Sequence, residues 1–302
     1  MRMSAFRPVF NHARLITLAV GDNTTNLYGY TPSKESGLAF VVLFGITTLL
    51  HTFQATRAKA WWLFPTAVIA GAAEVVGWAA RIQSASNPFS FHPYIIQITV
   101  LVLAPTPFVA ALFIGLRRIV THVGPQYSRL TPRWYSRIFL SVDILCLLIT
   151  GGGGGLAATG PTNPSAVKTG SDIILVGLGI QIFSLTVFCT LMAEFVWRRA
   201  NERPYHKEVT RGFPMDRNVK FLLAGITLST FFIYVRSIYR IIEFAGGFNG
   251  KIAHTEWLFI VFDGVMITLG MFTLNVFHPG RLLKKSEEGD YELTKTRTPR
   301  SV

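Results

Sequence analysis

Seven long apolar stretches run through this chain of 302 residues and set what it can fold into. A helix that crosses the hydrocarbon core of a bilayer needs about 20 predominantly apolar residues, at a rise of about 1.5 Å each. The sequence therefore predicts an all-α membrane protein, a bundle of seven transmembrane helices. The predicted spans are 36–56, 61–80, 94–116, 136–156, 172–196, 219–242 and 256–278.

The composition agrees with a membrane protein. Only 15% of the residues are charged and the mean hydropathy is +0.39, whereas soluble domains carry about 25% charged residues. The net charge of +13 does not indicate nucleic-acid binding, because the Lys and Arg mostly fall in short loops beside apolar stretches and leave no soluble basic surface. Cys146 and Cys189 lie inside apolar stretches and are expected to act as small apolar side chains.

The distribution of Lys and Arg predicts the orientation of the bundle. With the N-terminus outside, the cytoplasmic stretches together hold eighteen Lys and Arg, and each outer loop holds one. The cytoplasmic stretches are 57–60, 117–135, 197–218 and 279–302, and the outer loops are 81–93, 157–171 and 243–255. Cytoplasmic loops carry an excess of positive charge, so we expect the N-terminus outside and the C-terminus in the cytoplasm.

This orientation gives an expected domain organisation. Residues 1–35 form an extracellular arm, 36–280 the seven-helix transmembrane domain and 281–302 a disordered basic cytoplasmic tail. The arm carries the sequon Asn23-Thr24-Thr25, so Asn23 is a candidate for glycosylation. Lys284 and Lys285 favour anionic lipid headgroups at the membrane surface. We expect no cleavable signal peptide, because the first apolar run of the arm is too short to be its core.

Helix-breaking residues interrupt three spans. Pro105 and Pro107 are expected to kink the third span. The run Gly151 to Gly155 is expected to end the fourth, with close helix approach or local unwinding. The sequence His278-Pro279-Gly280 is expected to stop the seventh.

Ionisable and amide side chains inside the spans are the candidate functional residues. A charged side chain at mid-bilayer costs at least about 2.5–3.5 kcal/mol on insertion scales, so it needs a partner or a wet cavity. The spacing from Glu74 to Arg81 is close to two helical turns, which places both on one face. The candidates are Glu74, Arg81, Gln97, Asp143, Gln181, Arg236, Tyr239, Arg240, Glu243, Glu256 and Asp263.

Two interpretations of these residues remain open. They form interhelical salt bridges that fix packing, or they line a polar cavity that binds the head of an amphipathic substrate while its tail stays in lipid. For Glu74 and Arg81 the sequence does not decide. For the others on the sixth and seventh spans, the number of buried charges favours a cavity. The predicted topology places three Arg and four carboxylates in the outer half of the membrane, and Asp143 and His51 in the inner half.

Missing motifs exclude several enzyme classes. The sequence has no Walker phosphate loop, no zinc-type ligand spacing and no Gly-x-Ser-x-Gly elbow. We therefore expect no enzyme activity, no ATP hydrolysis, no metal and no cofactor. His51 is expected to be a hydrogen-bonding residue, with haem or porphyrin ligation as the alternative.

Several motifs occur in a characteristic order along the chain. They are Tyr28-Gly29-Tyr30-Thr31-Pro32-Ser33, Leu49-Leu50-His51, Glu74-Val75-Val76-Gly77-Trp78-Ala79-Ala80-Arg81, Gln97, Leu103-Ala104-Pro105, Asp143 before the glycine run, Arg236-Ser237-Ile238-Tyr239-Arg240-Ile241-Ile242-Glu243, Glu256, Phe262-Asp263, Asn275 and His278-Pro279-Gly280. Over residues 28–283 the chain resembles the fungal RTA-like family, also called the lipid-translocating exporter family. Thr150 and Trp78 stand where that family usually has Gln and Tyr, which leaves the substrate open.

The resemblance implies a fungal protein of the plasma membrane that gives resistance to toxic amphipaths such as aminocholesterol. It implies release or flipping of sphingoid long-chain bases, and in one branch porphyrin movement. Our first hypothesis is a lipid translocator, in which Arg236 and Arg240 bind a phosphate or hydroxyl and Glu74, Glu243 and Asp263 bind an amine. Glu74 or Asp263 would carry a proton. The alternatives are a lipid-stress sensor and a porphyrin or haem carrier that uses His51 or His278.

Overall fold

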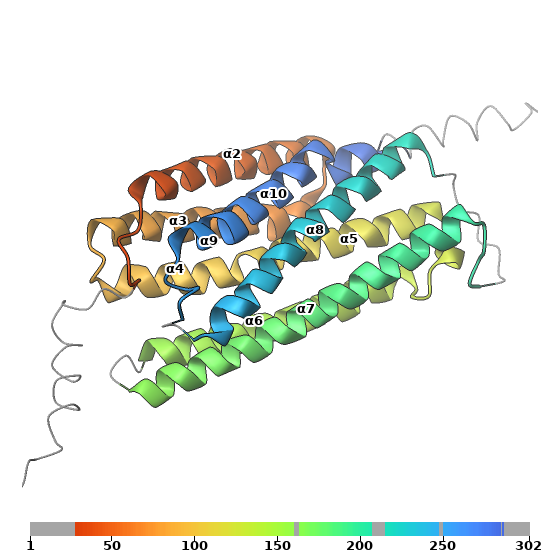
Figure 1. The fold of residues 1–302 in the computed structure, drawn as a ribbon. Helices are drawn as coiled ribbons and strands as arrows, with labels where there is room; N and C mark the ends of the chain where they lie inside the picture. The colour runs from red at the N-terminus through yellow and green to blue at the C-terminus, as the bar shows by residue number, and fades with distance from the viewer. Residues whose placement is uncertain (1–27, 160–162, 207–214, 248–249, 285, 287–302) are drawn as a thin grey trace, which may run out of the picture.

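The computed structural model describes residues 28–159, 163–206, 215–247, 250–284 and 286, and all its regular elements are helical (Figure 1). Seven helical stretches in this part are long and apolar enough to cross a membrane, which confirms the predicted number of spans. They are Lys34–Ala58, Trp61–Ser86, Phe91–Val123, Pro132–Ala158, Ser165–Ala200, Arg217–Ala245 and Glu256–Lys284.

Four of the spans are single α-helices and three are composite. The single helices are α2 (Lys34–Ala58), α6 (Pro132–Thr159), α7 (Pro164–Ala200) and α8 (Arg217–Ala245). The second span joins the 3-10 turn η1 (Trp61–Leu63), the π-helix η2 (Phe64–Val68) and α3 (Ile69–Ser86); the third joins α4 (Phe91–Leu103) and α5 (Pro105–Val123); the seventh joins α9 (Glu256–Phe259), the π-helix η4 (Ile260–Val265) and α10 (Met266–Val276). A short 3-10 turn, η3 (Pro125–Tyr127), follows α5.

Polar side chains cap the starts of three helices. The Ser33 hydroxyl accepts the backbone N–H of Ser36 at the start of α2. Asp216 accepts the N–H of Val219 at 2.9 Å at the start of α8, and Asn163 caps α7 in the same way. Such caps satisfy backbone donors that have no partner inside the helix, so the sequence sets where these helices begin.

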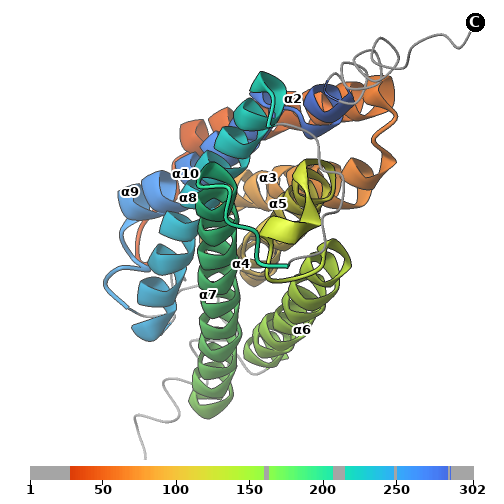
Figure 2. The ribbon, with the colours of Figure 1, turned by 90° about the vertical axis from the view of Figure 1, so that its right-hand side faces the viewer.

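The helices form an up-and-down bundle with α5 inside it. In Figure 1 α2 lies along the top and α6 with α7 along the bottom, and in Figure 2 α7 runs from the middle of the bundle to its lower edge with α6 beside it. Helix α5 packs against α3, α6 and α8. The third span, to which α5 belongs, is the most deeply buried of the seven candidate spans. Large apolar side chains point outward instead, such as Leu49, Phe183 and Val276, each more than 70% exposed. An apolar exterior of this kind suits lipid.

The proline and glycine predictions have different outcomes. A kink was predicted at Pro105 and Pro107; the helix is interrupted at the first of them, since α4 ends at Leu103 and α5 begins at Pro105, and α5 continues through the second. The prediction that the glycine run ends the fourth span was wrong, because α6 continues through Gly151–Gly155 to Thr159. The predicted close approach does occur: a Cβ on Gly153 would lie 2.7 Å from the carbonyl oxygen of Gly170 on α7.

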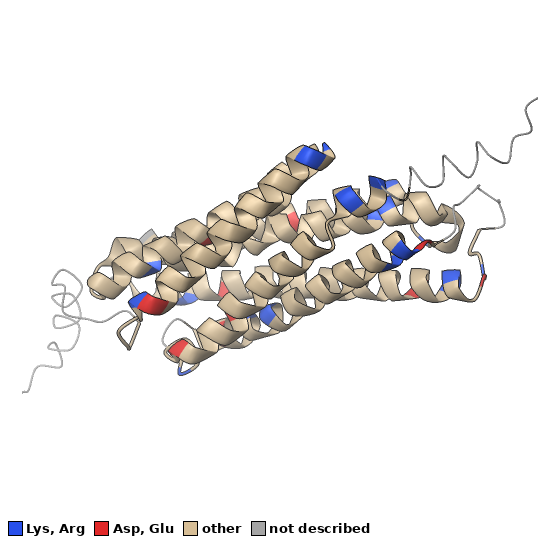
Figure 3. Cartoon of the chain, turned by 90° about the horizontal axis from the view of Figure 1, so that it is seen from above, with Lys and Arg blue, Asp and Glu red and all other residues tan. Residues whose placement is uncertain are grey.

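Basic residues gather at one end of the bundle, which we call the basic end. It is where α2, α5 and α7 finish and α6 and α8 begin (Figure 3). The sequence predicts that this end faces the cytoplasm, and we call the other the opposite end. Residues 281–284 at the start of the predicted tail are helical, so the prediction of disorder was wrong for these four residues. Asn23, Lys285 and residues 287–302 lie outside the described residues.

Candidate functional site

A buried charge cluster joins α8 to the π-helix η4. Arg240 holds Asp263 with two hydrogen bonds, from Nε to Oδ1 at 2.7 Å and from Nη2 to Oδ2 at 2.6 Å. The third nitrogen, Nη1, donates to Oε2 of Glu243 one turn further along α8 at 2.9 Å. Arg240 and Asp263 are almost fully buried. Bidentate arginine–carboxylate pairs of this kind are strong, and they fix the relative orientation of the two side chains.

Arg236 completes this cluster, and Pro105 explains its second contact. The Nε atom of Arg236 forms an ion pair with Oδ1 of Asp263 at 2.7 Å. In a regular helix the N–H of residue 105 would bond to the carbonyl of residue 101, but proline has no N–H. The carbonyl oxygen of Leu101 is thus available, and Nη2 of Arg236 donates to it at 2.6 Å. The break between α4 and α5 therefore helps to hold the guanidinium group.

A second ion pair lies at the opposite end. Nη2 of Arg81 on α3 lies 2.7 Å from Oε1 of Glu256, and the same oxygen accepts the backbone N–H of Ser33 at 2.8 Å. Nη2 also donates to the Tyr30 hydroxyl at 3.2 Å. The guanidinium carbon lies 4.8 Å from the ring centre of Phe259, a cation–π distance. Arg81 thus ties the segment before α2 to α3 and α9.

The contacts of Arg81 settle which partner it has. Arg81 and Glu74 lie on α3 and are both buried, as their shared face predicts. Arg81 pairs with Glu256 on α9 and not with Glu74, so Arg81 forms a salt bridge between helices of the kind expected and Glu74 forms none among the described residues. Within the described part of the chain, neither carboxylate oxygen of Glu74 has a hydrogen-bond partner.

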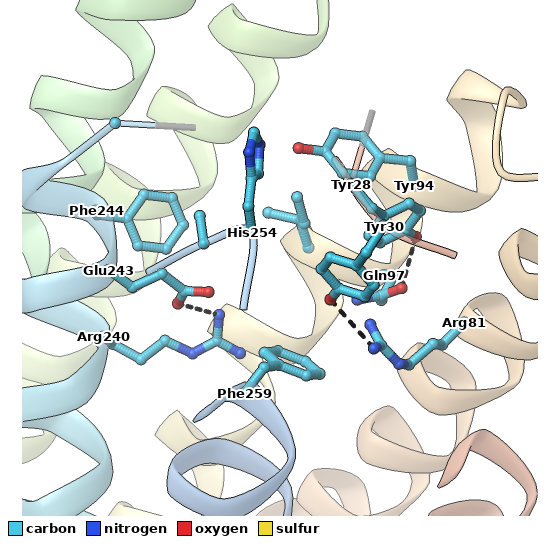
Figure 4. Close-up of a pocket in the computed structure, with 13 residues that line it drawn as sticks. Tyr28, Tyr30, Arg81, Tyr94, Gln97, Arg240, Glu243, Phe244, His254 and Phe259 are labelled. Atoms are coloured by element: carbon cyan, nitrogen blue, oxygen red, sulfur yellow. Dashed lines mark hydrogen bonds and ion pairs between the residues drawn. The ribbon is translucent and has the colours of Figure 1, made fainter. Parts of the chain in front are cut away.

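A pocket opens between the two groups of charges (Figure 4). Its cavity volume is about 40 Å³, and a water needs about 10–15 Å³ of such volume. In this conformation the pocket therefore accepts a few waters or an ammonium group, but not a whole lipid. Its lining residues are Tyr28, Tyr30, Arg81, Tyr94, Gln97, Ile98, Arg240, Glu243, Phe244, Gly247, Ala253, His254 and Phe259.

The segment before α2 supplies one wall of this pocket. The Tyr28 hydroxyl donates to Oε1 of Gln97 at 2.7 Å, and the Tyr28 ring packs edge-on against Tyr94 with ring centres 4.9 Å apart. Burial raises the pKa of Tyr28 to about 12, partly offset by the Ser84 hydroxyl and Arg81. Burial also raises the pKa of Tyr30. Both phenols are thus neutral near pH 7 and can donate hydrogen bonds.

The structure brings nine of the eleven candidate residues into this region and leaves two elsewhere. Tyr239 joins through its hydroxyl, 3.4 Å from Oε1 of Glu243. Asp143 lies on α6, and Gln181 lies on α7 with its amide nitrogen 3.5 Å from the Thr106 hydroxyl.

The sequence reasoning missed most of the aromatic wall. Tyr28, Tyr30, Tyr94, His254 and Phe259 line the pocket, and none was a candidate. The two tyrosines just before the first span were the signal that could have found part of it. His51 lies apart from the pocket, fully buried, with Nε2 3.2 Å from the carbonyl oxygen of Met271. That contact suits the predicted hydrogen-bonding role.

Comparison with known proteins supplies the family. The sphingoid long-chain base transporter RSB1 of Saccharomyces cerevisiae is 26% identical over 295 residues, covering 88% of this chain and 77% of the relative. The S. cerevisiae protein RTM1 is 29% identical over 298 residues, with 83% and 93% covered. The S. cerevisiae protein RTA1 is 27% identical over 278 residues, with 84% of each covered. The pattern described as "RTA1 like protein" matches residues 67–286, most of the helical bundle, and the chain belongs to this RTA1-like family.

Proposed function

We propose that this protein moves amphipathic lipids with a cationic head group across the membrane, with sphingoid long-chain bases as the leading substrate class. The similarity to a sphingoid long-chain base transporter supports lipid translocation. The seven candidate spans place the protein in a membrane, and we propose the plasma membrane. Resistance to toxic amphipaths would follow from their removal.

The numbers of positive and negative side chains at the site are the observation that supports a cationic head group. Three guanidinium groups face four carboxylates at the pocket and in the cluster beneath it. They are Arg81, Arg236 and Arg240, with Glu74, Glu243, Glu256 and Asp263. An uncompensated charge in a poorly solvated interior costs several kcal/mol. Glu74 is the acid without a guanidinium partner among the described residues, so when Glu74 is ionised the site carries one excess negative charge, which an ammonium group in the pocket would neutralise.

Glu243 is the residue we assign to the ammonium group. Its carboxylate belongs to the cluster through Arg240 and also lines the pocket. Asp263 is less suited, because two guanidinium groups already occupy it. The rings of Tyr28, Tyr30 and Phe259 at the same pocket already lie within cation–π distance of Arg81, so the assignment rests on the Glu243 carboxylate.

The proposed orientation gives the site a place in the transport path. With the N-terminus outside and the basic end in the cytoplasm, as the positive-inside rule predicts, the pocket opens toward the outer leaflet. The small cavity volume, about 40 Å³, means that the helices around it must separate when a head group passes. The tail would stay in the surrounding lipid, beside the apolar outer faces of the helices.

Translocation in liposomes tests the proposal. Purified protein is reconstituted, and movement of a fluorescent sphingoid base between leaflets is followed by quenching. We expect faster movement than in empty liposomes, a strong reduction in Glu243→Gln, and wild-type movement in the matched control Glu194→Gln, whose carboxylate lies at the basic end against Arg129 and Arg198. Folded wild-type protein that leaves the rate at the level of empty liposomes would refute the proposal.

A further inference from the structure

A further buried acid lies outside the charge cluster, on α6 where it packs against α5 and α7. Three phenylalanines, one from each helix, form an apolar layer with ring centres 4.6, 5.0 and 5.7 Å apart: Phe113, Phe139 and Phe188. Asp143 lies one turn after Phe139 on α6, and Ser184 one turn before Phe188 on α7. Because these two helices run antiparallel (Figure 1), Asp143 and Ser184 lie at the same level on facing sides.

Neither side chain has a hydrogen-bond partner in the described part of the chain. Asp143 is 1% exposed and Ser184 is 6% exposed. Among the residues that the structure describes, both carboxylate oxygens of Asp143 and the Ser184 hydroxyl lack a hydrogen-bond partner. Buried polar groups in proteins are nearly always hydrogen-bonded, and a buried carboxylate without any partner is strongly unfavourable unless it carries a proton.

No described positive charge faces Asp143 from the helices around it. At this level α5 contributes Val109 and Ala110, and one turn away lie Thr106, Cys146 and Gln181, all uncharged. The nearest charged residue along α6, Arg137, is exposed and lies over the Trp134 ring. The nearest along α7, Glu194, is already paired with Arg129 and Arg198.

This isolation sets Asp143 apart from the acids of the charge cluster. Two guanidinium groups hold Asp263 as a carboxylate, whereas a bare carboxylate at Asp143 would have no compensation. We propose that Asp143 is a proton-binding site, separate from the charge cluster, and that it gives up its proton only when the seam between α6 and α7 opens to water. Coupling of this proton to lipid movement rests on the proposed function.

The seam explains why opening is required. The phenylalanine layer closes the path from the basic end. Toward the opposite end the helices are in close contact, because a Cβ on Gly177 would lie 2.9 Å from the Thr150 side chain and one on Gly170 would lie 2.6 Å from the Gly153 carbonyl oxygen. A proton needs no preformed cavity, whereas a metal cation at this level would need more oxygen ligands than one carboxylate and one hydroxyl.

Carbodiimide labelling tests the proton site without any transport assay. Dicyclohexylcarbodiimide adds to protonated carboxylic acids in apolar surroundings. The reconstituted wild-type protein is treated with the reagent at a series of pH values and digested, and the masses of its peptides are measured by mass spectrometry. We expect a label on the Asp143 peptide that declines as pH rises, no label on the Asp263 peptide, and loss of the first label in Asp143→Asn. A label on Asp263 alone would overturn the proposal, and so would protection of Asp143 by sodium.

An infrared comparison covers the case in which the reagent does not reach the seam. The difference between wild-type and Asp143→Asn protein should contain the carbonyl band of a protonated carboxylic acid, and a carboxylate band in its place would overturn the proposal. Coupling is then measured as the effect of a pH gradient on lipid movement, which we expect in wild type and not in Asp143→Asn. Labelling in a protein that moves no lipid would leave the proton site standing and refute the proposed function instead.

Discussion

Removal of the Arg240 side chain is the perturbation whose effect on stability the structure specifies best. Arg240→Met keeps the bulk of the aliphatic stem but removes three hydrogen bonds to two buried carboxylates. Among the described residues, Asp263 then keeps the ion pair with Arg236 alone, and Glu243 keeps the long contact to Tyr239 at 3.4 Å alone. Removing one partner of a buried ion pair costs about 3–5 kcal/mol, because the other charge stays buried without compensation.

The comparison with an exposed pair makes this prediction specific. Arg129 at the basic end is 54% exposed and pairs with Glu194 at 2.6 Å, and exposed pairs contribute about 0–1 kcal/mol. At about 2–4 °C per kcal/mol for a domain of this size class, Arg240→Met should lower the Tm by roughly 10 °C in a thermal unfolding assay in lipid nanodiscs. Arg129→Met should change the Tm little.

A double variant separates buried charge from lost packing. Arg240→Met with Glu243→Gln leaves one fewer uncompensated carboxylate, so it should recover part of the lost stability. If Arg240→Met is no less stable than Arg129→Met, the cluster is not the buried, mutually dependent group of charges described above.

Three further outcomes are expected. Gly170→Ala should lower the Tm, because its Cβ would lie 2.6 Å from backbone, whereas Gly179→Ala, with open space around its Cα, should preserve it. Burial raises the pKa of Tyr28 to about 12. The packing of the neutral Tyr28 side chain therefore stabilises the fold fully below the ordinary phenol pKa of about 10, and this stabilisation is lost as pH rises through 12. In an absorbance titration of tyrosinate, the Tyr28→Phe variant should lack the ionisation step near pH 12 that belongs to Tyr28. Treatment with an N-glycosidase should shift the electrophoretic mobility of the wild-type protein produced in a eukaryotic host, but not that of Asn23→Gln. If the enzyme shifts the mobility of neither protein, the result counts against an external arm.

The number of spans was predictable because the bilayer imposes a minimum apolar length on each helix. The ends were less so: the fifth span was predicted as 172–196, but α7 begins at Pro164 and ends at Ala200. Hydropathy detects only the part of a helix that lies in lipid, and the polar turns beyond it carry no such signal. The cap at Asn163 was the better marker of the start.

The error at the glycine run has a physical cause. Glycine weakens a helix in water by about 1 kcal/mol per residue, which favoured a stop at Gly151–Gly155. Inside a bilayer, an unwound turn would leave backbone groups without hydrogen bonds, at several kcal/mol each. The helix therefore continues to Thr159, and the glycines serve close packing against α7 instead.

Spacing along the chain predicted the faces of the site but not its partners. Arg236, Arg240 and Glu243 follow one another at i, i+4 and i+7, a spacing that indicates one face of a helix, and all three are buried on α8. The pairing of Arg81 with Glu256 depends on which helices are neighbours in the membrane plane, and periodicity holds no information about that. The aromatic wall was missed for a related reason, since the segment with Tyr28 has no helical period.

The most direct test of the central claim compares two lipids in the same liposomes. A fluorescent sphingoid base and its N-acetylated form share a tail and differ in the charge of the head group, so only the first can balance the negative charge that an ionised Glu74 adds to the three paired carboxylates. The account predicts that wild-type protein accelerates movement of the amine well above that of the acetylated lipid, and that Glu243→Gln removes the difference. Equal acceleration of both lipids, or of neither, would contradict it.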